Sequence, residues 1–265
     1  MAIRIREAVA PRTSPDRLRR WLARWFRSAV NLIFPPRCAY CDLDLGEPHD
    51  ALLLCQACRE KLGPEQWPCC RRCGAAIPAD CPPPERCGLC RSARLHFDTV
   101  VPLAEYQEDL RSAILRMKRP PGESLSKAMG QLLARRRGQR LAELEPDVIA
   151  PIPMHWARRL KRGTNSPEIL AGCLAQRLGV PLEAHLLVRR RNTKPQPGLR
   201  PPQRFANLKG AFRTSKGYDF RGVRVLLVDD VLTTGATCSE AAHVLKQAGA
   251  AWVAAAVLAR AEGDK

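Results

Sequence analysis

A cysteine repeat constrains the fold of this chain more than any other feature of its sequence. Pairs of the form Cys-x2-Cys begin at Cys38, Cys55, Cys70 and Cys87. The first and third pairs lie 32 residues apart, as do the second and fourth, and this constant offset indicates a duplicated unit. Each unit supplies four thiolates in two close pairs, which is the donor set that tetrahedral zinc requires. The sequence therefore predicts two zinc sites.

The predicted zinc sites are structural because four cysteine ligands leave no coordination position for water. The surrounding segment is rich in glycine and proline and buries little apolar surface, so we expect zinc to supply much of its folding energy. One ion within each repeat is the preferred arrangement, although a cross-braced pairing is also compatible with the spacing. Cys69 and Cys81 fall outside the pattern and are interpreted as spare thiols. The predicted ligands are Cys38, Cys41, Cys55, Cys58, Cys70, Cys73, Cys87 and Cys90.

The alternative to zinc is a set of disulfides or buried thiols, and the expected compartment argues against disulfides. No stretch approaches the roughly 18 consecutive apolar residues of a membrane-spanning helix, and residues 1–10 lack the apolar core of a secretory signal. We therefore expect a cytoplasmic protein without a membrane span, whose thiols stay reduced. The hydrophobic fraction of 45% excludes a wholly disordered chain.

A second motif lies near the carboxyl end, where an apolar run leads into two acidic residues. Residues 225–228 read Val-Leu-Leu-Val, which is typical of a strand buried on both faces of a parallel sheet. Asp229 and Asp230, the acid pair, follow directly. A segment bearing threonine and glycine then leads into a predicted helix at about residues 236–248, and residues 252–258 predict the next strand.

The segment after the acid pair, which we call the phosphate loop, has the composition of an anion site. Its amides and the helix start can bind a phosphate, and the threonine hydroxyls add donors. The two carboxylates can accept hydrogen bonds from vicinal sugar hydroxyls or help to hold a divalent cation. A ligand with one phosphate and one ribose fits best, and the alternative is an ordinary strand that ends in a solvated aspartate pair. The loop consists of Thr233, Thr234, Gly235, Ala236 and Thr237.

Two further polar segments lie upstream of this motif. Residues 147–153 predict a strand that ends in a rigid turn, followed by a basic run that suits a diphosphate or, alternatively, forms a solvated helix face. Residues 189–198 are polar and rich in proline and glycine, which is typical of a mobile flap. The basic run consists of Arg158, Arg159, Lys161 and Arg162.

On these residues, the sequence resembles the type I phosphoribosyltransferases, whose signature for binding 5-phosphoribosyl 1-diphosphate (PRPP) is similar to residues 225–237. The cysteine-rich front joined to this signature resembles the ComF family of competence-associated, phosphoribosyltransferase-like proteins. One departure is Thr-Asn-Ser-Pro at residues 164–167, where the family usually has an aromatic residue, Asn and Gln; Ser166 can still cap a helix there. The other strings that carry the resemblance are residues 34–38, 151–153, 193–199 and 204–212.

The resemblance implies a fold, a ligand and roles for the motif residues. It implies that the phosphate loop holds the 5-phosphate, while Asp229 and Asp230, the catalytic residues, contact the ribose 2- and 3-hydroxyls. It implies that the basic run holds the leaving pyrophosphate, that Mg2+ binds with PRPP, and that the flap closes over the sugar. It also implies a role with the competence machinery in handling incoming DNA.

The expected fold class is α/β, with a type I phosphoribosyltransferase-like parallel-sheet domain preceded by a small double zinc-binding module. Strands and helices alternate between residues 97 and 258, which favours a parallel sheet with its site at the carboxyl ends of the strands. We expect the zinc module at residues 36–94 and the phosphoribosyltransferase-like domain at residues 96–265.

Residues 1–35 predict a basic amphipathic helix after a disordered start. Apolar residues recur at helical spacing from Leu18 to Ile33, with arginines mostly between them. Such a helix can dock on its own protein, lie on an anionic membrane or contact DNA phosphates, and docking is the preferred interpretation.

Two functions remain open at the level of sequence. The first is an enzyme, a phosphoribosyltransferase, which transfers a pentosyl group from PRPP to an acceptor that the sequence does not identify. The second is a competence factor without turnover that uses the same fold to bind single-stranded DNA or a phosphosugar. The net charge of +18 suits both, because nucleic acid and PRPP are both polyanions. The sequence does not indicate an oligomeric state.

Overall fold

The fold is known from a computed structural model, which describes residues 35–46, 52–91, 93–154, 165–193 and 198–261. The predicted amino-terminal helix and the basic run at residues 158–162 lie outside these ranges. Within the described ranges, no helix combines the length and the hydropathy that a membrane span requires.

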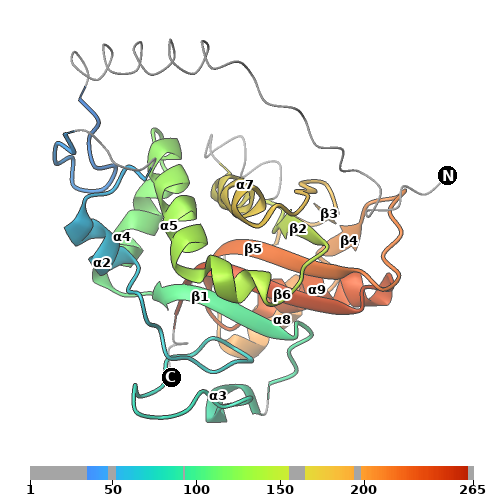
Figure 1. The fold of residues 1–265 in the computed structure, drawn as a ribbon. Coiled ribbons are helices and arrows are strands. Elements are labelled where there is room, and N and C mark those ends of the chain that lie inside the picture. Colours follow the sequence, from blue (N-terminus) through green and yellow to red (C-terminus); the bar gives the residue numbers. More distant parts are fainter. Residues whose placement is uncertain (1–34, 47–51, 92, 155–164, 194–197, 262–265) are drawn as a thin grey trace.

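A four-stranded parallel sheet forms the centre of the molecule (Figure 1). The strands follow the order β1-β6-β5-β2, so β5, which carries the acid pair, and β6 lie in the interior of the sheet. Alanine, valine and leucine fill β6 and the first part of β5, and these side chains are buried. The strands are β1 (Thr99–Glu105), β2 (Val148–Pro151), β5 (Arg224–Leu232) and β6 (Trp252–Arg260).

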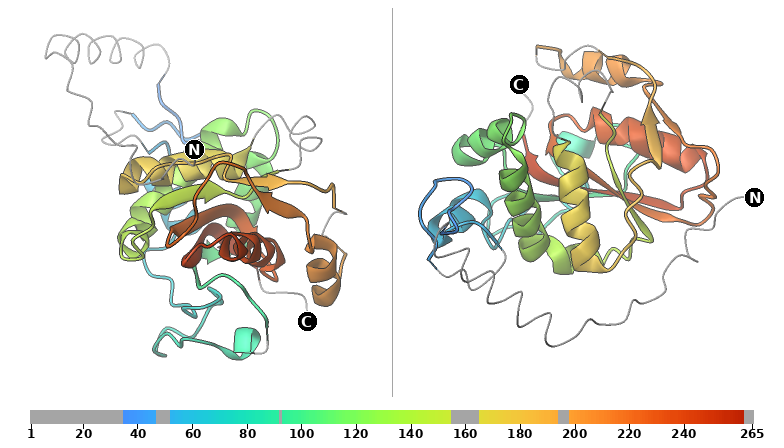
Figure 2. Two further views of the ribbon diagram at one scale, coloured as in Figure 1. Left: turned by 90° about the vertical axis from the view of Figure 1, so that its right-hand side faces the viewer. Right: turned by 90° about the horizontal axis from the view of Figure 1, so that it is seen from above.

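Helices cover both faces of the sheet (Figure 2), because alternate residues of each strand are apolar on opposite faces. Leu226 and Val228 pack toward α4, α5 and α7, whereas Val225 and Leu227 pack toward α9. These elements are α4 (Glu108–Met117), α5 (Glu123–Ala142), α7 (Ser166–Leu178) and α9 (Ala236–Gln247). The predicted α/β class with a parallel sheet is confirmed.

A short antiparallel hairpin interrupts the alternation that the sequence predicted. It pairs β3 (Leu187–Arg189) with β4 (Phe212–Thr214), and α8 (Pro201–Leu208) lies between the two strands in sequence. Part of the predicted flap is therefore ordered, since Arg189 belongs to β3 and the side chain of Thr193 is buried. Residues 194–197 of the flap lie outside the described ranges.

Two boundaries differ from the prediction for identifiable reasons. The strand predicted to end at Val228 continues to Leu232, because Asp229 pairs with Val257 and Val231 pairs with Ala259 on β6. Ser166 does not cap its helix, since Asn165 occupies the cap position.

The side chain of Ser166 is buried, and its hydroxyl lies 3.4 Å from the hydroxyl of Ser126 on α5. It contributes to packing between α5 and α7 instead of capping. The same interface requires a small residue on α5, because a Cβ added at Gly130 would lie 2.9 Å from the Sγ of Cys173 on α7.

The two halves of the cysteine repeat dock at separate places (Figure 1). The first cysteine cluster (Cys38, Cys41, Cys55 and Cys58) carries α2 (Gln56–Leu62) and lies beside α4, where the Tyr40 hydroxyl donates to Asp109 at 2.8 Å. The second cysteine cluster (Cys70, Cys73, Cys87 and Cys90) carries α3 (Gly88–Arg91) and lies against β1, where a Cβ added at Gly74 would meet Pro102 at 3.1 Å.

Arg137 on α5 fixes the linker between the two clusters. Its guanidinium donates to the carbonyl oxygens of Pro64 and Glu65 in the linker and of Pro102 and Leu103 in β1, at 2.6–3.1 Å. Burial lowers the pKa of Arg137 to about 10, so the side chain stays charged at neutral pH. The bonds to Pro102 and Leu103 are buried, so water cannot easily replace the donor there.

Replacement of Arg137 by Met is therefore expected to lower the free energy of unfolding by about 3 kcal/mol, because it leaves the buried carbonyls of Pro102 and Leu103 without this donor. Urea denaturation followed by circular dichroism measures the change. Arg135→Met is the matched control, since Arg135 lies on the same helix with an exposed side chain. Equal losses in the two variants would contradict the role assigned to Arg137.

Candidate functional site

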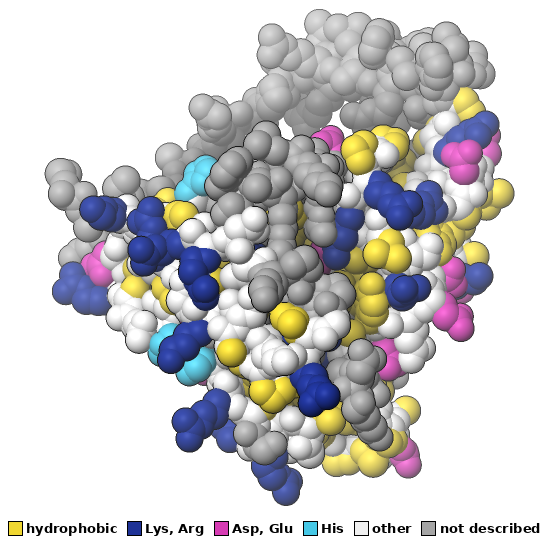
Figure 3. All heavy atoms as spheres, turned by 180° about the vertical axis from the view of Figure 1, so that it is seen from behind, with side chains coloured by type: hydrophobic (Ala, Val, Ile, Leu, Met, Phe, Trp, Pro, Cys, Tyr) yellow, Lys and Arg dark blue, Asp and Glu magenta, His cyan; other side chains and the backbone are white. Residues whose placement is uncertain are grey.

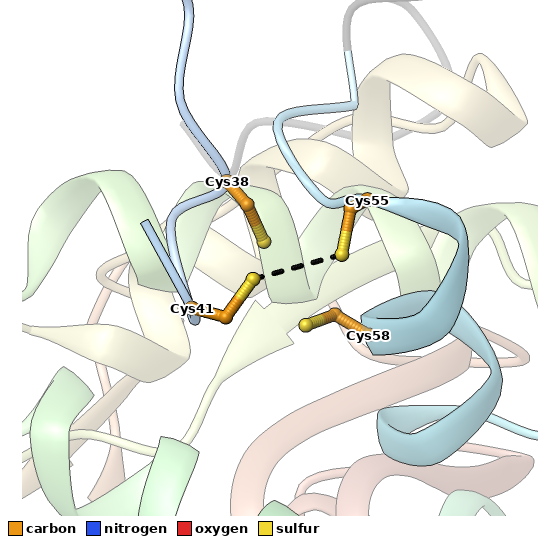
Figure 4. A group of neighbouring side chains, drawn as sticks. All are labelled: Cys38, Cys41, Cys55 and Cys58. Carbon is orange, nitrogen blue, oxygen red and sulfur yellow. Dashed lines mark hydrogen bonds between the residues drawn. The ribbon is translucent and has the colours of Figure 1, made fainter. Parts of the chain in front are cut away.

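The two cysteine clusters have the geometry of tetrahedral metal sites. In each cluster the four Sγ atoms lie within 4.8 Å of one another. Figure 4 shows the first cluster, whose four side chains point toward one another. The Sγ atoms of Cys41 and Cys55 are 3.7 Å apart, and those of Cys73 and Cys87 are 3.6 Å apart. A tetrahedron with zinc–sulfur bonds of about 2.3 Å has sulfur–sulfur edges of about 3.8 Å. The spacing fits zinc and is far too long for a disulfide.

Each cluster also contains a thiol that is prepared to be a thiolate. At Cys38, burial acts to raise the pKa, but hydrogen bonds from the amides of Cys41, Cys55 and Tyr40 outweigh it and lower the pKa to about 7. At Cys87, burial is likewise outweighed, chiefly by the amide of Cys90, and the pKa lies below the ordinary value. Thiolates are the form that binds zinc.

The ligand sets settle the pairing of the repeats. Each cluster takes all four sulfurs from one repeat, so the sequential arrangement is confirmed and cross-bracing is not present in the described part of the chain. Neither spare thiol belongs to a cluster: Cys81 is exposed, and the buried Cys69 accepts a hydrogen bond from Arg140 at 3.5 Å. The sites are closed structural zinc sites, without a position for reacting water.

The acid pair lies in the last part of β5. Asp230 forms an ion pair with Lys118, whose Nζ lies 2.9 Å from Oδ2, and both side chains are mostly buried. Asp229 accepts a hydrogen bond from the amide of Asp230 at 2.9 Å. Lys118 directly follows the last residue of α4, so the end of α4 and the end of β5, which are distant in sequence, meet at the acid pair.

The surroundings of Asp229 shift its pKa. Burial, and then the charge of Asp230, raises the pKa of Asp229 to about 7. The positive charges of Lys118 and Arg189 act in the opposite direction and lower that pKa, although they do not outweigh burial. A carboxylate with these surroundings is ready to accept hydrogen bonds or bind a cation that lowers its cost of ionisation.

The phosphate loop joins β5 to α9 at the carboxyl end of the sheet. Gly235 is the N-cap of α9 and adopts a φ of +80°, which favours glycine. It offers no side chain to cap the helix, and the first turn of α9 contains no acidic residue that would repel an anion. The loop therefore presents helix amides beside the acid pair, as an anion site requires.

The structure brings together only some of the residues that the sequence nominated. The acid pair and the loop residues from Thr233 to Thr237 are adjacent on β5 and α9. The basic residues Arg158, Arg159, Lys161 and Arg162 follow β2, the neighbour of β5, but lie outside the described ranges.

Sequence reasoning missed two cations of the site. Lys118 pairs with the acid pair, and Arg189 is close enough to influence the titration of Asp229. Lys118 lies between a helix end and the run Arg-Pro-Pro-Gly, and a lysine beside such a turn could have been recognised as a candidate site residue. Arg189 is one of three consecutive arginines, so composition alone does not select it.

Models of two known families match separate parts of the chain. The phosphoribosyl transferase domain matches residues 166–265, which include the acid pair and the phosphate loop. The double zinc ribbon domain matches residues 29–91, which include both cysteine clusters. The structural zinc sites therefore rest both on the donor geometry and on this match.

Similar proteins span most of the chain. Competence protein F of Haemophilus influenzae is 31% identical over 230 residues, which cover 85% of this chain and 97% of that protein. DNA utilization protein YhgH of Escherichia coli (strain K12) is 31% identical over 76% of this chain and 93% of that protein. Among solved structures, a purine phosphoribosyltransferase from Pyrococcus horikoshii is 23% identical with a TM-score of 0.34, over 50% of this chain and 73% of that one.

Proposed function

This chain belongs to the ComF family, whose members include competence protein F, and on that premise we propose that it binds PRPP with Mg2+ and transfers the phosphoribosyl group. The observation that carries the proposal is the acid pair near the end of β5, which a short loop joins to the glycine-bearing start of α9, where no side chain caps the helix. This arrangement provides acceptors for a diol and donors for a phosphate within one strand-loop-helix unit.

Each part of PRPP has a counterpart in the proposed site. The 5-phosphate accepts hydrogen bonds from the amides and hydroxyls of the phosphate loop. The carboxylates of Asp229 and Asp230 accept hydrogen bonds from the ribose 2- and 3-hydroxyls. The diphosphate extends toward the loop after β2, where Arg158, Arg159, Lys161 and Arg162 would neutralise its charge.

The reaction we propose needs no nucleophile from the protein. The bond between the anomeric carbon and the diphosphate oxygen breaks, the diphosphate keeps the electron pair, and an acceptor nucleophile bonds to the same carbon. The carboxylates of Asp229 and Asp230 orient the sugar, and their negative charge stabilises the positive charge that develops on the ring. Mg2+, when bound, would neutralise part of the charge on the departing diphosphate; the hard carboxylate oxygens of the acid pair fit this ion.

Isothermal titration calorimetry with PRPP, in the presence and absence of Mg2+, tests the proposal. We expect Mg-dependent binding to the wild-type protein and at least a tenfold loss of affinity in Asp230→Asn. Glu143→Gln is the matched control, because it neutralises an exposed carboxylate at the carboxyl end of α5, on the opposite edge of the sheet. Absence of PRPP binding by the wild-type protein sinks the proposal.

A second candidate function is the binding of single-stranded DNA without turnover. No acidic residue occurs from residue 184 to residue 218, a stretch that contains nine lysines and arginines and includes the β3–β4 hairpin and α8. Figure 3 shows basic side chains more widespread than acidic ones on the face opposite that of Figure 1. The names of the relatives, competence and DNA utilization, accord with such a role in those proteins.

The affinity for a single-stranded oligonucleotide, measured at several salt concentrations and compared with the affinity for PRPP, tests this second function. Affinity for a single-stranded oligonucleotide should fall steeply as salt rises, and Arg190→Ala with Arg213→Ala, both exposed, should reduce it. Unchanged affinity in this double variant, with PRPP binding intact, removes the hairpin from any DNA-binding surface.

A further inference from the structure

The rear of the phosphate loop is held by Arg260, the last residue of β6. The Arg260 side chain is buried, with 7% of the residue exposed. Its Nε donates to the carbonyl oxygen of Cys73 at 3.0 Å, and its Nη1 donates to the carbonyl oxygens of Leu232, at 3.2 Å, and Thr233. One guanidinium therefore joins a ligand of the second cysteine cluster to the first residue of the phosphate loop.

A second contact joins the same two regions through apolar side chains. A Cβ added at Gly235 would lie 3.2 Å from the ring of Phe97 and 3.4 Å from the side chain of Leu95. Leu95 also packs against the second cysteine cluster. The space that a side chain at position 235 would occupy is thus filled by Leu95 and Phe97, which follow shortly after that cluster in the sequence.

The segment between Leu95 and Phe97 also reaches the first turn of α9. The backbone amide of His96 donates to the hydroxyl of Ser239 at 3.1 Å, and the Nδ1 of His96 lies 3.1 Å from the same oxygen. Ser239 is buried and its amide donates to the carbonyl of Gly235 at 2.8 Å. The second cluster is thus connected to Thr233 at the start of the loop, to Gly235 in its middle, and to Ser239 in the part of α9 that follows it.

The first cysteine cluster has different surroundings. Cys38 and Cys58 pack into the main core with α4 and α5, and Arg116 on α4 donates to the carbonyl of Tyr40 at 2.5 Å. The two clusters therefore have equivalent ligands but different neighbours, which allows their effects to be separated by experiment.

We infer that the second cysteine cluster, and not the first, holds the phosphate loop in the conformation that binds phosphate, through Arg260 and residues 95–97. This inference rests on the proposed function only in naming the ligand; the coupling itself is a property of the free protein. Arg260 is a positioning residue, since it acts on the loop carbonyls and leaves the loop amides facing the ligand. Its guanidinium donates to the carbonyl oxygens of Cys73, Leu232, Thr233 and Ala261, and its charge adds positive potential behind the anion.

Matched cysteine variants test the coupling. Cys87→Ser removes a ligand of the second cluster and Cys41→Ser removes a ligand of the first; native mass spectrometry counts the zinc ions in each. Both proteins are studied at a temperature at which circular dichroism shows that they remain folded. In the absence of ligand, amide hydrogen exchange at residues 232–239 should accelerate at least tenfold in Cys87→Ser and stay unchanged in Cys41→Ser.

The affinity for Mg-PRPP should fall about tenfold in Cys87→Ser and remain unchanged in Cys41→Ser. Arg260→Met, with both zinc ions bound, should reproduce the effects of Cys87→Ser on exchange and affinity, and Arg260→Lys should recover part of both. The double variant Cys87→Ser/Arg260→Met should lose little more loop protection or PRPP affinity than either single variant, since both changes break the same connection. If Cys87→Ser does not fold, Arg260→Met and Leu95→Ala in the zinc-loaded protein test the same connection.

The outcomes separate the inference from the proposed function. Loop exchange that is unchanged in both Cys87→Ser and Arg260→Met, or that increases equally in Cys41→Ser, overturns the inference whatever PRPP does. Exchange that responds as expected, in a protein that binds no PRPP, supports the coupling and removes the proposed function.

Discussion

Replacement of Asp229 by Asn is expected to abolish measurable PRPP binding and, at the same time, to stabilise the ligand-free protein above pH 7. The two effects have one cause. Burial and the charge of Asp230 raise the pKa of Asp229 to about 7, so ionisation of this carboxyl costs folding free energy. The side chain is retained at this cost because its acceptor oxygens meet the proposed ribose hydroxyls, which an amide with its NH2 group serves poorly.

The direction of the pH dependence follows from the raised pKa. The folded state holds the Asp229 proton more tightly than the unfolded state, whose pKa is the ordinary value of 3.8. Asp229 therefore contributes stability that is fully present below about pH 4 and is lost as pH rises through about 7. Because Asn carries no proton to lose, the stabilisation of Asp229→Asn should grow over this window, to on the order of 2 kcal/mol at about pH 8.

Thermal unfolding of the wild-type protein, Asp229→Asn and Glu143→Gln, from about pH 5 to about pH 8, measures this effect. Calorimetry with Mg-PRPP at about pH 8 measures binding in the same samples. A variant that is less stable than the wild-type protein at every pH indicates a structural role for Asp229. A variant that still binds PRPP with wild-type affinity removes Asp229 from the site.

Loss of zinc from the first cysteine cluster is expected to unfold the protein far more readily than loss from the second. Cys58, Leu54 and Leu62 belong to the main core beside the sheet, so release of the first ion exposes part of that core. The second cluster forms a small core of its own, made by Cys70, Cys73, Ala75 and Cys90. Structural zinc supplies folding energy only to the residues that it organises.

Cys58→Ser should therefore lower the melting temperature by roughly 10 °C, and Cys90→Ser, which removes an equally buried ligand of the second cluster, by less than about half of that. Differential scanning fluorimetry with metal counts on each sample provides the comparison. Equal shifts in the two variants contradict the unequal docking of the clusters, and a larger shift in Cys90→Ser reverses it.

The parts of this molecule that the sequence predicted are those encoded by short, local patterns. The cysteine spacing predicted both ligand sets, because each pair lies on one turn and the repeat preserves its offsets. Short continuous apolar runs, which alternate with helical segments along the chain, predicted the parallel sheet and α9. The residues after Gly235 begin a helix as predicted, because glycine at the N-cap is followed by residues that favour helix.

The missed parts depend on residues that are far apart in the chain. Arg260 meets Cys73 across 187 residues, and Lys118 meets Asp230 only after α4 and β5 are packed. The strands β3 and β4 contain three residues each, too few for a periodic pattern to identify. Ser166 resembles a cap in sequence, but its burial against α5 decides its role.

Because the two cysteine clusters dock at separate places on the sheet domain, the two copies of the repeat cannot replace each other. Leu54 and Leu62 complete the interior of the sheet domain, and Arg137 fixes the connection between the ribbons to β1. In a fragment limited to residues 36–94, Leu54 and Leu62 would be exposed to water. The two clusters placed on another protein would likewise lack the core against which these leucines pack. The zinc-binding segment is thus a structural part of the sheet domain and not an independent domain that could be transferred to another protein.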